Sequence, residues 1–287
     1  MNYSIIKIYQ QIKMVDSTSH FLKSGTFQKK NVILTGATGG IGSLVLKDLL
    51  ACGANVLALV RDPKKLPPYL NDYTKTGQFN YEVIDLEVGP KFTSVMTSAM
   101  LKLKGKLDIL ILCHGSFQFG DINTISLADF DSNINVNVRA NFSLLTLAVP
   151  FLKITKGNVV MISGVESRIV EKDYFLHALT KTMINSMVQN AALELASFGV
   201  RVNAVAPSVT NTQLRVSEQL KEQDNMNYIA QMGGYSLLSN EVVQPQDVAE
   251  AILFLASDEA EFMTGEVMTV DNGFELNHDL TFKNHAY

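Results

Sequence analysis

The stretch "NVILTGATGGIGSLVLKDLLACG", residues 31–53, decides the fold of this chain. It opens with a run of β-branched residues, turns at "TGATGGIG" (Thr35–Gly42) and continues as an apolar segment with helical period. A glycine-rich turn between a strand and a helix brings backbone N–H groups and the helix N-terminus to one point, where they suit a pyrophosphate. The residues predicted to line such a dinucleotide site are Gly36, Thr38, Gly40, Ile41 and Gly42.

Six further strand-like runs follow, each separated from the next by a longer segment of helical period. They are "NVLALV" (55–60), "FNYEVI" (79–84), "LDILILC" (107–113), "GNVVMIS" (157–163), "VRVNAVA" (200–206) and "EVMTV" (266–270). Parallel strands need helical crossovers and are buried on both faces. The pattern therefore predicts an α/β, doubly wound Rossmann-type fold with a seven-stranded, mostly parallel sheet and helices on both faces.

The same pattern divides the chain into one domain with short additions. The domain spans residues 31–275, and a long irregular region at about 207–240 is expected to be a lid loop, because a segment of that length is uncommon in a compact domain unless it is functional. Residues 1–30 are an N-terminal extension and residues 276–287 a C-terminal tail in this division.

The composition limits the partners and the compartment. With 287 residues, 47% of them hydrophobic and 18% charged, the chain can bury one substantial core. A net charge of -4 with scattered lysines offers no basic surface to nucleic acid, and no run of about 18 apolar residues predicts a membrane span. Cys52 and Cys113 are expected to be buried thiols, too few for a disulfide framework. We expect a soluble protein without a clear targeting signal, in the cytoplasm or a reducing organelle matrix.

Residues after the second and third strands bear on the choice of dinucleotide. Arg61 follows the second strand, where an acid would hold the ribose hydroxyls of NAD and an arginine can take the 2′-phosphate of NADP. NADP is therefore favoured over NAD, although Arg61 also fits a solvated cation in the charged loop "RDPKKLPP" (61–68). Asp85, with Leu86 beside it, could meet the adenine edge, or Asp85 could simply cap the next turn.

Several motifs in order resemble those of a known family. The glycine spacing TGxxxGxG is followed by "LDILILCHG" (107–115), "SNINVNVRANFSLLTLAVPFL" (132–152), "ALELASFGVRVNAVAPSVTNT" (192–212) and "DVAEAILFLASDEAEFMTGEVMTVDNGF" (247–274). Together they make residues 30–275 similar to the short-chain dehydrogenase/reductase family, and to its tetrameric 3-oxoacyl reductases in particular. The resemblance implies further cofactor contacts at His114 and Gly115, in the segment that reads NNAG in the family, and at Pro207 and Thr212.

The resemblance also locates four catalytic positions. In this family a serine, a tyrosine and a lysine act with an asparagine. The tyrosine gives a proton to the substrate carbonyl oxygen as hydride arrives, and the lysine lowers the tyrosine pKa while holding the nicotinamide ribose. Asn137 and Lys181 match their positions. The tyrosine position is His177, and the serine position, thirteen residues earlier, is Gly164.

Neighbouring side chains offer doubtful substitutes for the two missing hydroxyl groups. Ser163 adjoins Gly164 but faces the other side of its strand, so a backbone adjustment would be needed to bring it into the site. Tyr174 shares a helix face with His177 and Lys181, one turn from the usual place, or is a packed aromatic residue at the helix start. His177 itself is either a hydrogen-bonded histidine on a helix face or a replacement proton donor. The charge of Lys181 should lower the pKa of His177, and neutral imidazole is a poor acid, which counts against the role of donor.

These departures lead to two hypotheses. The leading one is an NADP(H)-binding protein with weak or absent carbonyl reductase activity, a pseudoenzyme that acts as a structural, assembly or sensing subunit. The alternative is an active NADP-dependent oxidoreductase of the carbonyl or 3-oxoacyl reductase type, with His177 or Tyr174 as proton donor to a small carbonyl substrate.

The resemblance also implies an oligomer, and the histidine spacing argues against a metal site. A homodimer or homotetramer, or a subunit of a larger assembly, is implied, built on the helices around 127–153 and 174–198 and on the final strand. His114 and His177 have no evident third ligand, so no metal is expected.

Overall fold

One parallel sheet forms the centre of the computed structural model, which describes residues 25–88, 91–214 and 221–277. Its strands are β1 (Asn31–Thr35), β2 (Asn55–Val60), β3 (Phe79–Val83), β4 (Ile109–Leu112), β5 (Asn158–Ile162), β6 (Arg201–Pro207) and β7 (Val267–Val270). All pair in parallel, in the order β3-β2-β1-β4-β5-β6-β7. The predicted seven-stranded sheet and its doubly wound topology are confirmed.

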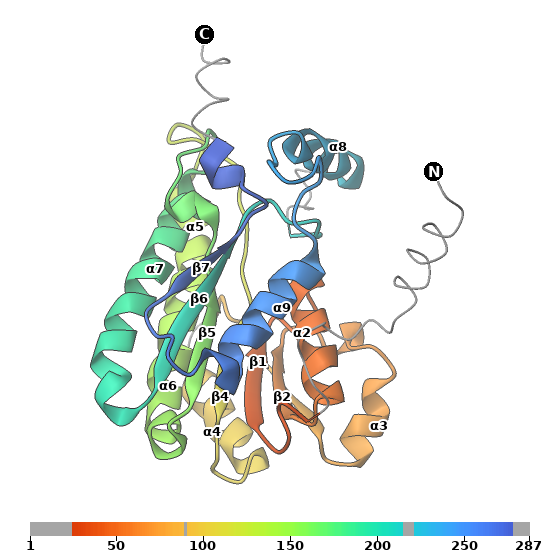
Figure 1. The fold of residues 1–287 in the computed structure, drawn as a ribbon, viewed down its shortest axis with the longest axis vertical. Coiled ribbons are helices and arrows are strands. Elements are labelled where there is room, and N and C mark those ends of the chain that lie inside the picture. Colours follow the sequence, from red (N-terminus) through yellow and green to blue (C-terminus); the bar gives the residue numbers. More distant parts are fainter. Residues whose placement is uncertain (1–24, 89–90, 215–220, 278–287) are drawn as a thin grey trace, which may run out of the picture.

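Helices cover both faces of the sheet (Figure 1). One layer consists of α2 (Gly40–Ala51), α3 (Leu70–Lys75) and α9 (Pro245–Ala256), and the other of α4 (Phe92–Lys102), α6 (Ala140–Thr155) and α7 (Phe175–Leu195). α5 (Leu127–Ile134) continues through a π-helical segment (Asn135–Arg139) into α6, and α8 (Glu222–Gly233) follows β6. Short 3-10 turns lie at Pro63–Lys65, Val165–Ser167, Ala196–Phe198 and Asp258–Ala260.

The core has two halves because the strands are buried on both faces. Ile33, Leu57 and Leu110 face the layer of α4, α6 and α7, whereas their neighbours in the strands face α2 and α9. The packed part begins before the first strand: Phe27, inside the predicted N-terminal extension, is 1% exposed. Residues 1–24 of that extension and residues 278–287 of the predicted tail lie outside the described residues.

One helical stretch of the described residues, Leu127–Thr155, has the length and hydropathy to cross a membrane. In this fold it comprises α5, the π-helical segment and α6, and α6 packs its buried face on the sheet. A core helix passes the same test of length and composition, and 39% of the tested window is buried inside this fold.

The region expected to be a lid contains a helix. α8 lies within residues 207–240, and it stands apart from the two helical layers in Figure 1, near the carboxyl ends of β6 and β7. Residues 215–220 of this region lie outside the described residues. The strand order reverses between β1 and β4, and in doubly wound sheets the crevice at that reversal, outside the carboxyl ends of the strands, is where ligands bind.

Candidate active site

The glycine-rich turn lies at the carboxyl end of β1, and two of its glycines cannot be replaced without moving backbone. Gly36 has a φ of 69°, in the left-handed region, and a Cβ there would stand 2.4 Å from the Cys113 carbonyl oxygen. A Cβ on Gly42 would stand 2.1 Å from the Gly36 carbonyl oxygen. α2 begins at Gly40, so its unpaired N–H groups lie at this turn. The turn therefore fits the pyrophosphate of a dinucleotide.

The loop after β6 adjoins this turn. A Cβ on Gly40 would stand 2.9 Å from Thr212 Cγ2, so the structure brings together the turn and the residue predicted to contact the nicotinamide end. Pro207 is the last residue of β6. Thr38 and Ile41 are half-buried beside the glycines. The turn and the loop after β6 thus lie at the carboxyl ends of the strands, where doubly wound sheets form their ligand crevice.

The residues expected at the adenosine end lie on the β2–β3 side of this crevice. Arg61 follows β2 and is exposed. Asp85 Oδ1 accepts a hydrogen bond from the Glu87 backbone N–H at 3.0 Å, which is the capping role that its sequence context also allowed. Leu86 is half-buried beside it. Cofactor contact by these three side chains stays a prediction.

His114 is a buried structural connection in this crevice, 9% exposed, with Gly115 following it. Its Nε2 lies 3.1 Å from the Val136 carbonyl oxygen, which can only accept, so Nε2 carries the proton. Nδ1 then accepts from Thr35 Oγ1 at 2.7 Å, and Thr35 Oγ1 accepts from the Cys113 N–H at 3.0 Å. His114 therefore joins the ends of β1 and β4 to the π-helical segment.

His114 should make the fold sensitive to acid. Burial lowers its pKa to about 4, with a smaller contribution in the same direction from Lys181. Because the folded-state pKa lies below the ordinary histidine value of 6.5, the unfolded chain takes up a proton first, and stability is lost as the pH falls from about 6.5 towards 4. The full loss is about 3 kcal/mol. When the pH is lowered from 7 to 4.5, the free energy of unfolding in urea should fall less for His114→Gln than for wild type. An equal fall in the two proteins would contradict this role of His114.

Asn137 lies in the π-helical segment, and its side chain is fully hydrogen-bonded. Its Oδ1 accepts from the Ser116 N–H at 2.7 Å, and its Nδ2 donates to the Ser116 carbonyl oxygen at 3.0 Å. Nδ2 also lies 3.4 Å from Thr180 Oγ1, on α7 beside Lys181. Asn141 Nδ2 donates to the Asn137 backbone oxygen at 2.7 Å. Asn137 thus ties the segment after β4 to the helix that carries Lys181.

Lys181 is a buried cation on α7. It is 6% exposed, and its Nζ donates to the Ile162 carbonyl oxygen, at the end of β5, at 2.9 Å. Burial lowers its pKa to about 8, while the negative charge of Glu166 opposes the shift. Lys181 is therefore still charged at neutral pH, although the fold disfavours that charge.

Gly164 faces the site, and another side chain fills the space beside it. A Cβ on Gly164 would stand 2.5 Å from Glu166 Oε2, 3.4 Å from Lys181 Cγ and 3.7 Å from His177 Nε2. Position 164 therefore points at the lysine and the histidine, as the resemblance implies. Glu166, which is 4% exposed, extends its carboxylate into the space where a side chain at 164 would lie.

His177 is buried beside that carboxylate, with Nε2 3.8 Å from Glu166 Oε2. The structure therefore places a carboxylate as well as the Lys181 cation near the His177 ring. Ser163 faces away from the site, as its place in the strand predicts: its Oγ donates to Asn185 Oδ1 and lies 3.3 Å from the Lys181 carbonyl oxygen.

Tyr174 directs its hydroxyl away from the histidine, towards α8. Its OH lies 2.5 Å from the Tyr228 OH, which in turn donates to Glu171 Oε1 at 3.3 Å. The Tyr174 ring is 2% exposed and packs edge-on against Phe117, whose ring centroid is 4.9 Å from that of His177. Tyr174 is thus a packed aromatic residue at the helix start, and its ring contacts connect α8 with the site.

The structure brings Asn137, Gly164, His177 and Lys181 together and adds Glu166, which sequence reasoning missed. The available signal was a glutamate two residues after Gly164, just beyond a strand predicted to be buried. Glutamate is almost never buried unless it is paired, so its place in the sequence pointed to a partner in the site. Tyr228 was also missed, because it lies 54 residues from Tyr174 in a segment read as irregular.

The cysteines and potential metal ligands have separate surroundings. Cys52 is buried as expected, whereas Cys113 is only half-buried. Although part of the residue is exposed, desolvation of its thiol raises the pKa of Cys113 to about 12, so it is a thiol at neutral pH. In residues 25–88, 91–214 and 221–277, no three side chains of His, Cys, Asp or Glu are grouped so that they could hold a metal ion.

Comparison with known proteins identifies relatives that are similar to this chain in sequence. The model of the family described as enoyl-(acyl carrier protein) reductase matches residues 36–275. Two tropinone reductase homologues of Arabidopsis thaliana are 28% and 29% identical, over 254 and 250 residues. The first alignment covers 88% of this chain and 93% of the relative, and the second 86% and 93%.

Solved structures share the fold. A short-chain dehydrogenase/reductase of unknown function from Caenorhabditis elegans, with cofactor, superposes with a TM-score of 0.79 at 24% identity. Ligand-free aldohexose dehydrogenase from Thermoplasma acidophilum does so with a TM-score of 0.77 at 23% identity. Each comparison covers 88% of this chain and 97% of the other.

Proposed function

The chain belongs to the short-chain dehydrogenase/reductase family, which implies a nicotinamide dinucleotide cofactor, and we propose that it binds NADP(H) with little or no ordinary carbonyl reductase activity. The observation that carries this proposal is Glu166: its carboxylate fills the space beside Gly164, where the family has a serine side chain. Such a protein would act as a structural, assembly or sensing subunit in a reducing compartment.

Cofactor binding is supported by the parts of the site that keep the family pattern. Gly36 and Gly42 shape the turn at the start of α2, and Thr212 adjoins it. Lys181 supplies a buried positive charge at the end of β5. When bound, the reduced nicotinamide supplies a hydride. A fluorescence titration with NADPH tests the binding, and the absence of saturation would overturn this half of the proposal.

Loss of catalysis is supported by the directions of the hydroxyl groups. Position 164 has none, Ser163 faces Asn185, and the Tyr174 hydroxyl lies against Tyr228. Loss of one donor to a developing oxyanion costs about 10²–10³ in rate. The glutamate carboxylate, whose negative charge acts on Lys181, would also repel the negative charge that develops on a carbonyl oxygen during reduction.

Arg61 should determine the preference for NADP over NAD. It is exposed after β2, where a guanidinium can pair with the 2′-phosphate. Arg61→Ala should weaken NADPH binding by about tenfold or more, because a charged hydrogen bond contributes about 1.5–3 kcal/mol, and should leave NADH binding nearly unchanged. Lys75→Ala, on α3, is the matched control. Equal losses for both dinucleotides would count against the assignment.

A second candidate function is supported by the 3.8 Å separation of His177 Nε2 and Glu166 Oε2. A carboxylate that favours the imidazolium would make His177 a competent acid, and the protein an active NADP-dependent oxidoreductase on a small carbonyl substrate. The discriminating measurement is the pH profile of NADPH oxidation. Activity that falls as the pH rises, and is lost in His177→Gln, would favour this alternative.

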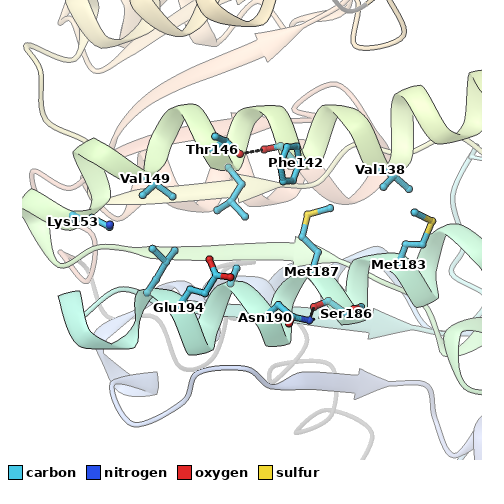
Figure 2. Close-up of a pocket in the computed structure, with 13 residues that line it drawn as sticks. Val138, Phe142, Thr146, Val149, Lys153, Met183, Ser186, Met187, Asn190 and Glu194 are labelled. Atoms are coloured by element: carbon cyan, nitrogen blue, oxygen red, sulfur yellow. Dashed lines mark hydrogen bonds between the residues drawn. The ribbon is translucent and has the colours of Figure 1, made fainter.

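The assembly we propose is a homodimer formed through the faces of α6 and α7. A groove of about 650 Å³ lies between these helices. Figure 2 shows its side chains pointing towards one another from the two helices, with Met183, Met187 and Phe142 among them. Phe142 is 59% exposed, and Phe130 of α5 and Leu179 of α7 add exposed apolar surface. A second copy of this surface would remove it from water.

Met187→Glu should disrupt this dimer, because it places a charge in the groove. Sedimentation velocity should show a shift from dimer to monomer. Leu193→Glu is the matched control: Leu193 is 80% exposed on the same helix and does not line the groove. A wild-type protein that is already monomeric, or an equal effect of both variants, would contradict the proposed interface.

A further inference from the structure

The Glu166 carboxylate occupies the space in which a side chain at position 164 would lie. Glu166 lies in the 3-10 turn after β5, and its Oε2 is 2.5 Å from the place where a Cβ on residue 164 would stand. It is 4% exposed. The carboxylate therefore points inward, to a position defined by Gly164 on one side and by α7 on the other.

The groups around this position suit an anion. Lys181 is a buried cation, and Glu166 is the strongest charge favouring its protonated form. His177 contributes a second basic group, with Nε2 at 3.8 Å from Glu166 Oε2. A buried carboxylate needs basic groups nearby. His177 and Lys181 lie on one helix face, and Lys181 acts on the carboxylate through its charge, since its Nζ donates to the Ile162 carbonyl oxygen.

We propose that Gly164, His177 and Lys181 form an anion site, that Glu166 is its internal ligand, and that Glu166 excludes the carbonyl oxygen of a substrate from it. The inference rests on the function proposed above and identifies Glu166 as the residue that limits carbonyl reduction. Negative charge develops on the carbonyl oxygen during reduction, so an oxyanion site is what such a substrate needs. Here a side chain of the protein already fills it.

Restoring the family residues at positions 164 and 177 alone would not open the site to a substrate. Gly164→Ser adds a Cβ at a point only 2.5 Å from Glu166 Oε2, so the new hydroxyl competes with the carboxylate for one space. A serine at 164 and a tyrosine at 177 would therefore leave the site occupied. Restoration requires a change at 166 as well.

The test removes the internal ligand and offers a small carboxylate from solution. Glu166→Ala leaves Lys181 and His177 facing a vacated space. Sodium acetate should then raise the melting temperature of Glu166→Ala by about 3 °C or more beyond its effect on wild type, with sodium chloride at equal ionic strength as reference. Equal acetate effects on the two proteins would overturn the proposal.

Two further variants make the result specific. Glu275→Ala removes the carboxylate paired with Arg168 and should respond to acetate as wild type does. Glu166→Gln keeps the volume and removes the charge, so it should gain no acetate response. If Glu166→Ala does not fold, NMR of the lysine side chains decides: the pKa of Lys181 should be lower in Glu166→Gln than in wild type, and equal values would overturn the proposal.

An NADPH titration on the same samples separates this inference from the proposed function. Saturable NADPH binding without a specific acetate response would overturn the anion site alone. A specific acetate response without NADPH binding would support the anion site and overturn the proposed cofactor binding.

Discussion

Gly42→Ala should abolish saturable NADPH binding. Its Cβ would stand 2.1 Å from the Gly36 carbonyl oxygen, and that atom is backbone at the carboxyl end of β1, so no side-chain movement relieves the clash. The turn would have to open, which moves the N-terminus of α2 away from the pyrophosphate position. We expect at least a 100-fold loss of affinity, about 2.7 kcal/mol.

The matched control is Gly77→Ala. Gly77 has a left-handed φ of 78°, and nothing lies within 4 Å of its Cβ position, so this variant shows the cost of left-handed strain alone, about 1–2 kcal/mol of stability. Its NADPH affinity should equal that of wild type. A Gly42→Ala protein that binds NADPH within threefold of wild type would show that the turn is not the dinucleotide site.

Lys181→Met should weaken NADPH binding and remove a pH dependence of stability that the buried charge imposes. Burial depresses the pKa of Lys181 from 10.5 to about 8, so the charged lysine costs the folded state free energy at neutral pH, by about 3 kcal/mol in total. Methionine fills similar volume without that charge. Loss of the cation should weaken NADPH binding by about 10-fold or more. A variant that loses stability and keeps its affinity would make Lys181 a structural residue.

The pH dependence of stability gives this prediction a second check. The folded-state pKa of Lys181 lies below the unfolded value, so between about pH 8 and 10.5 the unfolded chain binds more protons and wild-type stability rises with pH. Lys181→Met lacks this rise. Wild type should therefore gain stability relative to Lys181→Met as the pH increases through this range, as urea titrations can measure. A constant difference would contradict the assigned pKa.

Much of the fold could be predicted because it depends on local patterns. Strands buried on both faces require uninterrupted β-branched runs, and each of the seven runs became a strand. The turn from Gly36 to Gly42 could also be predicted, since only glycine permits the backbone approach found there. The match of Lys181 to the family's lysine followed from the motif spacing, whereas its hydrogen bond to the Ile162 carbonyl oxygen is visible only in the structure.

The rest depends on contacts between distant residues, which no local pattern encodes. Glu166 matters because a glycine two residues earlier leaves space for its carboxylate, and the space exists only once α7 packs on β5. The role of His114 depends on Val136, which approaches through the π-helical segment. The sequence left Tyr174 as either a substitute proton donor or a packed aromatic residue. The choice depends on Tyr228 of α8, which lies in a region that the sequence pattern marked as irregular.

The most direct test of the central claim compares carbonyl reduction by wild type and by the variant Gly164→Ser, Glu166→Ala, His177→Tyr. Both proteins are first titrated with NADPH to show equal binding, and kcat/KM is then measured on a panel of aldehydes and ketones. The account predicts a wild-type kcat/KM at least about 10²-fold below that of the variant on the best substrate. A wild-type protein that reduces any of these carbonyls as fast as the restored variant would contradict it.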